Sequence, residues 1–423
     1  MSTATRNRQI FAAVIGNALE WYDFVIYGFM TVIISRLFFP SDSEYASLLI
    51  AMATFGVGFF MRPVGGVLIG LYADRRGRKA ALQLIILLMT IATAMIAFAP
   101  TYAAIGIAAP AIMVLARLLQ GAATGGEFAS ATAFLIESSP PERRGFFGSL
   151  QMVGQSIAAL SGATAGMLVT QGLTPEQIDD WGWRLPFLFG LLIGPVGLWM
   201  RRHLSETEEF VAASKDETQH LGLIAVLREH YRDVLVCFGL VVSTTIMFYV
   251  VLIYMPTYAK TQLNIPLKDA FTAQVAGLIF LTVLIPLFGM LSDRIGRRAV
   301  LMLAALLYLV LTYPMMAWML AEPSLIRLAV MQVALCSAIA VGFGAISTAL
   351  AEQFPVRQRS TGLALAYNMA VMIFGGFAQL IVTWLIKETG SLLAPSFYVM
   401  FGATVGLVSA YFIIDRRKHV EGA

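Results

Sequence analysis

The chain has 423 residues, of which 58% are hydrophobic and only 13% are charged, with a formal net charge of +4. Soluble domains carry about 25% charged residues, so this composition excludes an ordinary soluble domain, and so small a net charge gives no indication of nucleic-acid binding. The charge is gathered in short Arg and Lys clusters between long apolar runs, which is the pattern of a polytopic membrane protein.

Twelve apolar runs follow one another along the chain. A helix that crosses about 30 Å of hydrocarbon needs about 20 mostly apolar residues. The predicted spans are 11–34, 47–72, 81–99, 105–136, 146–170, 184–200, 233–257, 271–291, 300–320, 326–351, 361–386 and 395–414. The fourth and tenth are longer than a bilayer requires, so we expect them to tilt or to project from it.

The spans fall into two groups of six. We therefore predict an all-α membrane protein with one six-helix half in residues 1–200 and the other in 233–423. The polar stretch 201–232, which mixes acidic and basic residues, is predicted to be a solvated cytoplasmic linker between them.

The loops between the spans differ in basic content. One alternate set, which includes both termini, holds 21 of the 29 Lys and Arg residues, and the opposite set holds five. Because basic loops face the cytoplasm, both termini are predicted to be cytoplasmic. The first apolar run contains Glu20 and Asp23 and shows no cleavage site, so no signal peptide is predicted. Cys237 and Cys336 both fall inside spans, which does not indicate a disulfide framework.

A basic motif occurs once in each group of six spans. Its first copy runs from Gly70 to Lys79 and its second from Gly289 to Arg298, 219 positions later. Glu137 and Glu352 form a second matching pair, because each stands three residues before a proline and is followed by arginines and a glycine. Two matches at nearly one offset indicate an internal repeat.

The repeated motif, together with Arg117, Gln120 and Gly121 in the fourth span, resembles the major facilitator superfamily. The segments 17–24, 60–66, 125–127 and 181–187 resemble its metabolite–proton symporter family. Within that family, 39–44 and 292–302 are most similar to the citrate and tricarballylate branch. The resemblance covers essentially the whole chain. It implies a multi-pass secondary transporter with the major facilitator fold, in a bacterial inner membrane, and we expect a monomer.

We expect the repeated motif to act as a conformational latch that holds the two halves together in the outward-open state. Its glycines allow close helix approach, and its aspartates can meet a helix N-terminus or a basic side chain. A role as topology anchors in the headgroups is the alternative for its arginines. The candidate latch residues are Gly70, Asp74, Arg75, Gly77, Arg78, Glu137, Arg144, Gly289, Asp293, Arg294, Gly296, Arg297 and Glu352.

Charge inside the membrane is confined to the first half. At about 1.5 Å per residue, Asp23, Arg62 and Arg117 each lie about 18 Å from one end of their spans. No Asp, Glu, Lys, Arg or His lies well inside a span from 233 to 415. Because a charge near the bilayer centre is costly, such residues indicate function. The candidate proton-coupling residues are Asp23, Arg117, Glu20 and Glu127.

We expect Asp23 to pair with Arg117, as an Asp and an Arg do in related sugar porters, so that protonation of Asp23 frees Arg117 for an anionic substrate. A fixed structural ion pair is the alternative. Arg62 could instead satisfy backbone carbonyls freed at Pro63, and Glu20 could face a vestibule. The candidate substrate-binding residues are Arg62, Arg117, Tyr27, Gln120, Gln151, Gln155, Tyr249, Tyr367 and Asn368.

No Walker motif, metal-ligand cluster or nucleophile elbow occurs in the sequence. We therefore expect no enzyme and no cofactor, and a proton gradient as the energy source. The expected partners are a small organic acid, protons and the bilayer, with no nucleic acid. Import of citrate or another tricarboxylate by alternating access is the first hypothesis.

Several alternatives remain at this stage. A dicarboxylate, a shikimate-like acid or a zwitterionic osmolyte such as proline or betaine could be the substrate. The tail after Asp415 shows no heptads, which disfavours the osmosensing members. A passive facilitator of the same fold is a further alternative. A membrane sensor would need an output domain, for which 201–232 is too short.

Overall fold

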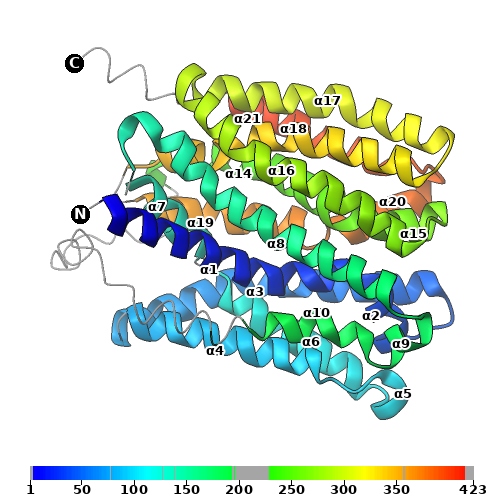
Figure 1. The fold of residues 1–423 in the computed structure, drawn as a ribbon. Coiled ribbons are helices and arrows are strands. Elements are labelled where there is room, and N and C mark those ends of the chain that lie inside the picture. The colour runs from blue at the N-terminus through cyan, green and yellow to red at the C-terminus, as the bar shows by residue number, and fades with distance from the viewer. Residues whose placement is uncertain are drawn as a thin grey trace, which may run out of the picture.

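The computed structural model describes residues 3–76, 78–125, 127–137, 139–192, 195, 228–355 and 358–414. All regular structure in these ranges is helical. Long helices lie side by side along one direction (Figure 1). Eight described helical stretches are long and apolar enough to cross a bilayer alone, and a ninth is added if α1 and α2 count as one bent span. The predicted all-α membrane fold is confirmed.

The first half contains ten α-helices in the described residues. They are α1 (Thr3–Phe29), α2 (Thr31–Phe38), α3 (Glu44–Arg76), α4 (Arg78–Ala97), α5 (Tyr102–Ile105), α6 (Ala108–Ala123), α7 (Glu127–Glu137), α8 (Arg144–Gly172), α9 (Pro175–Asp180) and α10 (Leu185–Gly190). Short 3₁₀ turns at Pro141–Arg143 and Gly182–Arg184 precede α8 and α10.

The second half contains eight α-helices in the described residues. They are α14 (Tyr231–Met247), α15 (Met255–Leu263), α16 (Leu267–Ile295), α17 (Arg297–Ala321), α18 (Leu325–Glu352), α19 (Arg359–Ala370), α20 (Ala378–Thr389) and α21 (Ala394–Tyr411). π-Helical turns at Phe248–Tyr254 and Val371–Gly375 join α14 to α15 and lead from α19 towards α20.

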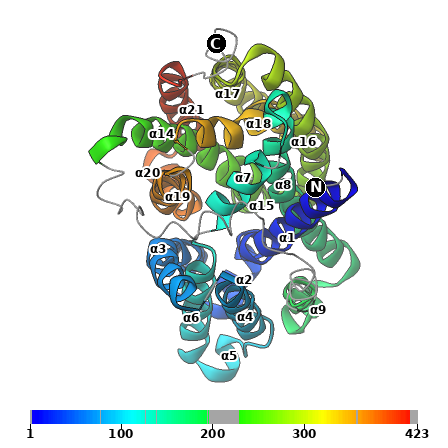
Figure 2. The same ribbon diagram turned by 90° about the vertical axis from the view of Figure 1, so that its left-hand side faces the viewer.

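Helices of the two halves meet through α8. Figures 1 and 2 show α3, α4 and α6 grouped on one side and α14 to α21 on the other, with α1 and α8 between them. α8 packs against α1 of its own half and against α16 of the other. The predicted linker lies outside the described residues up to 227, and the division at 200 and 233 stays a prediction.

In the described part of the chain, the first and fourth predicted spans are not single straight helices. α1 and α2 meet at an angle of 62°, so the span predicted at 11–34 is bent. The span predicted at 105–136 does not tilt as one helix but is interrupted between α6 and α7. The Thr124 hydroxyl there lies within hydrogen-bonding distance of the Gln120 and Gly121 carbonyls, and helix kinks occur where such a residue adjoins glycine. The span predicted at 184–200 is described only at 184–192 and 195.

Glycines bring α3 and α6 into direct backbone contact. A Cβ atom on Gly121 would overlap the carbonyl of Gly58, and one on Gly65 would overlap the carbonyl of Ala122. Small residues allow such close approach between membrane helices. Because Arg62 stands four residues after Gly58, and Arg117 four before Gly121, this contact sets the separation of the two arginine-bearing backbones.

Contacts between the halves close the bundle at both ends. At one end, which we call the Glu137 end, Arg359 Nη1 lies 2.8 Å from Glu137 Oε1. At the other, the Tyr45 end, the Lys387 ammonium lies 3.9 Å from the centre of the Tyr45 ring. Each pair joins one half to the other, so the two halves are in contact at both ends.

Replacing Gly121 by Ala tests the α3–α6 contact. The added methyl forces the helices apart, and we expect a loss of about 1–3 kcal/mol of stability, as for other overpacked cores. Thermal unfolding in detergent, followed by tryptophan fluorescence, measures the loss. Gly172→Ala is the control, because nothing lies within 4 Å of a Cβ at that position. Equal unfolding temperatures for the two variants would contradict the packing role.

Candidate functional site

Among the residues whose side chains the structure describes, four charged ones are buried inside the first half. Glu20 and Asp23 lie on α1, Arg62 lies on α3 and Arg117 lies on α6. Arg117 is completely buried. Charged groups reach such positions only when hydrogen bonds or opposite charges replace water. The neighbours of Asp23 and Arg117 therefore determine what this cluster can do.

Asp23 and Arg117 do not form the direct ion pair that the sequence predicts. The Thr93 hydroxyl on α4 instead donates to Asp23 Oδ2 at 2.7 Å. Gln120 Nε2 donates to Thr93 Oγ1 at 3.3 Å, and Arg117 Nη1 donates to Gln120 Oε1 at 2.6 Å. The direct pair is replaced because α4 places a hydroxyl against the carboxylate and α6 places an amide one turn from the guanidinium. Two neutral side chains thus connect the two charges.

Aromatic rings and backbone carbonyls surround the two guanidinium groups. Arg117 also donates to the carbonyls of Phe24 and Phe55, at 3.3 and 3.4 Å. The Phe24 ring centre lies 4.4 Å from Arg117 Cζ and 5.0 Å from Arg62 Cζ, so both cations interact with one ring. Arg62 Nε donates to Thr124 Oγ1 at 3.1 Å. Cation–π contacts and hydrogen bonds to neutral groups therefore stabilise both arginines.

A small cavity lies between the halves. Residues from α1, α7 and α8 line it on one side, and residues from α14, α18, α19 and both π-helical turns line it on the other. Three predicted substrate residues, Gln155, Tyr249 and Tyr367, contribute to the lining.

The other predicted substrate residues do not line this cavity. They are Arg62, Arg117, Tyr27, Gln120, Gln151 and Asn368. The Asn368 amide donates to the carbonyl of Gly125 at 2.7 Å and so joins the two halves. The Tyr27 hydroxyl donates to the carbonyl of Ala51 at 3.3 Å. The side chain of Glu127 lies outside the described part of the chain.

Four aromatic residues of the lining were not among the substrate-binding residues predicted from the sequence. Trp21, Phe128, Phe248 and Phe343 all face the cavity. An aromatic side chain in an apolar span has the same sequence pattern whether it packs in the core or lines a cavity, so no local signal distinguishes the two. Trp21 is the exception in part, because it stands between Glu20 and Asp23 on α1.

Tyr249 connects the cavity to the buried arginines. Its ring contacts the rings of Phe55 and Phe59, with centre separations of 6.0 and 5.5 Å. It lies within electrostatic range of both Arg62 and Arg117. Among the described residues its buried hydroxyl has no hydrogen-bond partner. A ligand in the cavity would therefore meet a free hydroxyl that adjoins two cations.

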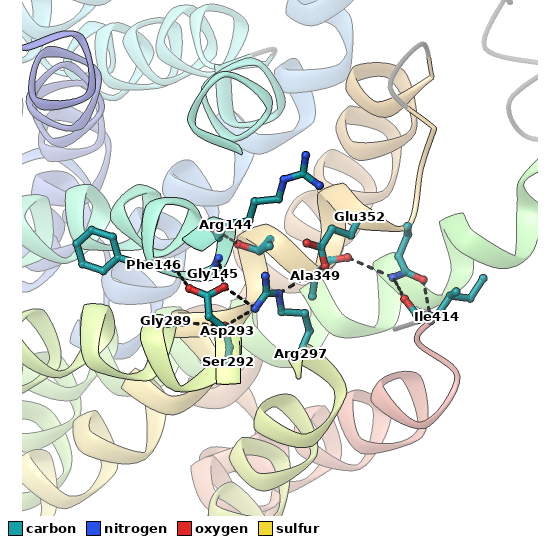
Figure 3. Close-up of polar contacts among 12 residues, drawn as sticks. Arg144, Gly145, Phe146, Gly289, Ser292, Asp293, Arg297, Ala349, Glu352 and Ile414 are labelled. Atoms are coloured by element: carbon teal, nitrogen blue, oxygen red, sulfur yellow. Dashed lines mark hydrogen bonds and ion pairs between the residues drawn. The ribbon is translucent and has the colours of Figure 1, made fainter. Parts of the chain in front are cut away.

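The second copy of the basic motif holds the N-terminus of α8. Asp293 accepts hydrogen bonds from the amides of Gly145 and Phe146, at 2.7 and 2.9 Å, and Arg297 Nη1 donates to it at 2.9 Å (Figure 3). A carboxylate at a helix N-terminus is stabilised by the free amides and the helix dipole. Gly296 has φ = 96°, a conformation that favours glycine.

Most of the other candidate latch residues of this copy lie nearby. Arg297 Nε lies 3.5 Å from Glu352 Oε2, and the carbonyl of Arg144 accepts a hydrogen bond from Thr348. A Cβ on Gly289 would contact α8, which explains the close helix approach. Arg294 is exposed and makes none of the described polar contacts. The latch function itself stays a prediction.

The first copy cannot be compared in the same way. Gly77 lies outside the described residues, as do the side-chain surroundings of Gly70, Asp74, Arg75 and Arg78. Arg359, which pairs with Glu137 across the halves, was absent from the predicted latch. Its position after Pro355, in the segment that matches the one after Glu137, was the available signal.

Comparison with known proteins finds relatives that match nearly the whole chain. The Major Facilitator Superfamily model matches residues 13–285, and the Sugar (and other) transporter model matches residues 203–417. A citrate-proton symporter of Salmonella typhi is 37% identical, over 98% of this chain and 96% of its own. A proline/betaine transporter of Salmonella typhimurium is 33% identical, over 95% and 82%. The crystal structure of a D-xylose-proton symporter shares the fold, with a TM-score of 0.77 at 17% identity, over 97% and 98%.

Asp293→Asn should loosen the Glu137 end. Loss of the charge weakens the cap on α8 and leaves the nearly buried Arg297 with less compensation. We expect about tenfold faster maleimide labelling of a cysteine placed at Ser149, the α8 residue that faces Gly289, since a hydrogen bond to a charged group contributes roughly 1.5–3 kcal/mol. Asp269→Asn, at the other end of α16, is the matched control. Unchanged labelling in Asp293→Asn would count against the latch.

Proposed function

Because this chain belongs to the major facilitator superfamily, we propose that it imports a small organic acid, citrate or another tricarboxylate, together with protons by alternating access. Like the relatives named above, it is a transporter and not an enzyme. The Salmonella typhi relative, named as a citrate-proton symporter, supports both the class of substrate and the coupling ion.

The buried charge cluster is the observation that carries this proposal. Arg62 and Arg117 lie within electrostatic range of Tyr249 in the cavity wall, and Asp23 is connected to Arg117 by hydrogen bonds. Guanidinium groups suit carboxylates in both charge and geometry. Protonation of Asp23 removes a negative charge from the cluster, and the remaining positive charge favours an anionic substrate.

The same proposal includes the energetics and the orientation. One net charge that crosses a potential of 100 mV gains about 2.3 kcal/mol, which supports roughly fifty-fold accumulation. The excess of basic residues in alternate loops supports cytoplasmic termini and a cytoplasmic position for the Glu137 end. The first six-helix half would then carry proton coupling, and the protein would act as a monomer in a bacterial inner membrane without a cofactor.

A zwitterionic osmolyte is the second candidate substrate. Six aromatic side chains line the cavity, namely Trp21, Phe128, Phe248, Tyr249, Phe343 and Tyr367. Aromatic rings bind alkylated ammonium groups through cation–π contacts, while the arginines could hold the carboxylate. The Salmonella typhimurium relative is named as a proline/betaine transporter.

Uptake into vesicles tests the proposed function. Purified protein in proteoliposomes is offered labelled citrate, oxoglutarate, shikimate, proline or glycine betaine, with and without an inward proton gradient. We expect citrate to accumulate with the gradient and an uncoupler to dissipate it. Uptake that never exceeds equilibrium would indicate a passive facilitator. Accumulation of betaine but not citrate would favour the second candidate and contradict the first.

Asp23→Asn should separate coupling from binding. The amide cannot ionise, so we expect proton-driven accumulation to be abolished while exchange of labelled for unlabelled substrate continues. Both rates are measured in the same vesicles. Asp42→Asn, in the exposed loop before α3, is the control and should behave as the parent protein. Full uphill uptake by Asp23→Asn would refute Asp23 as the coupling carboxyl.

A further inference from the structure

We propose that Thr93 and Gln120 are positioning residues that transmit the ionisation state of Asp23 to the guanidinium of Arg117. This inference rests on the proposed function and extends it. It replaces a direct carboxylate–guanidinium contact by three hydrogen bonds that run through two neutral side chains. Those bonds connect α1, α4 and α6.

The direction of each of these three hydrogen bonds follows from the two charged groups that they connect. An arginine side chain only donates, so the Gln120 oxygen must face Arg117. The Gln120 amide nitrogen therefore faces Thr93, and the Thr93 oxygen accepts from it. The Thr93 hydroxyl hydrogen then remains for Asp23 Oδ2, which is an acceptor when the carboxyl is ionised. The observed donors and acceptors match this order at all three links.

Water has little access to this chain of bonds. Thr93, Gln120 and Arg117 are completely buried, and only 1% of the Asp23 surface is exposed. A Cβ on Gly190 of α10 would overlap Asp23 Oδ1, so that helix closes over the carboxyl from the other side. In such surroundings hydrogen bonds between charged ends polarise one another and are stronger than in water.

The charged and titratable groups around Asp23 are few. Glu20 and Tyr22 on its own helix and Arg117 on α6 lie within electrostatic range of it. α4 presents the Thr93 hydroxyl and α10 presents Gly190, neither of which titrates in the accessible range. Arg117 is thus the cationic group that hydrogen bonds connect to Asp23, so its environment changes when Asp23 gains or loses a proton.

Protonation of Asp23 disrupts this order at its first link. A proton on Oδ2 reverses this link, because the carboxyl then donates to the Thr93 oxygen, which accepts from Gln120 as well, and the Thr93 hydrogen must turn to another acceptor. A proton on Oδ1 leaves the bond in place but removes the charge that strengthens it. In either case Arg117 loses stabilisation and becomes a better partner for a substrate carboxylate. By linkage, substrate binding then favours protonation in turn.

Removal of the Thr93 hydroxyl tests this role. Thr93→Val keeps the shape of the side chain and cuts two of the three bonds. In proteoliposomes we expect the ratio of uphill citrate uptake to citrate exchange to fall about tenfold, the usual effect of losing a hydrogen bond to a charged group. Protons taken up per citrate, followed with a pH electrode, should fall in parallel. Thr93→Ser keeps the hydroxyl and should restore most of both quantities.

A matched control lies one turn away on the same helix. Among the described residues, the Thr90 hydroxyl bonds only to the Ile86 carbonyl of its own helix, so Thr90→Val should leave the ratio unchanged. Thr93→Ala, which adds no atoms, replaces Thr93→Val if that variant does not fold. An unchanged ratio in the folded hydroxyl-free variant would overturn the proposal, and so would an equal loss in Thr93→Ser. If citrate uptake by the parent protein does not depend on the proton gradient, the proposed function itself is wrong.

Discussion

Arg117 holds a permanently charged guanidinium at a site that water does not reach, and the packing of α1, α3, α4 and α6 accommodates it. The carbonyls of Phe24 and Phe55 and the side-chain oxygen of Gln120 accept hydrogen bonds from it, while aromatic rings cover its faces. Close approach of α3 to α6 through glycine keeps these acceptors within reach. A wider helix pair would leave a buried cation without partners, which is strongly destabilising.

The two halves are joined at their ends by contacts that are individually modest. The Glu137–Arg359 pair and the Lys387–Tyr45 contact are at opposite ends, and each is partly open to solvent. Exposed pairs of this kind contribute about 0–1 kcal/mol, so neither end is locked. The Asp293 cap on α8 is more deeply placed and uses backbone amides, which makes the Glu137 end the stronger closure. Each closure must be weak enough to open if the two conformations are to interconvert.

The sequence was sufficient for the architecture and for the cluster of buried charges, but not for the links within that cluster. Length and hydropathy locate spans, and a charge in an apolar run stands out wherever it lies. Thr93 does not stand out, because a threonine in a membrane helix usually bonds to its own backbone, as Thr90 does. Only the rotation of α4 against α1 distinguishes the two threonines. The aromatic cavity wall was hidden for a similar reason, since Phe128 and Phe343 resemble any core residue.

The two halves share a repeated motif but differ in chemistry. The first half provides ionisable groups, whereas the second provides neutral surfaces, such as Tyr249, and its helices change to π-helical turns beside the cavity. A π-helical turn shifts the side chains that follow it and often marks a functional region. Gly375 in one such turn packs against the Tyr249 ring in the other. Both halves line the cavity, so a change of substrate would alter the aromatic lining that both supply, whereas the buried charges of the first half can stay the same.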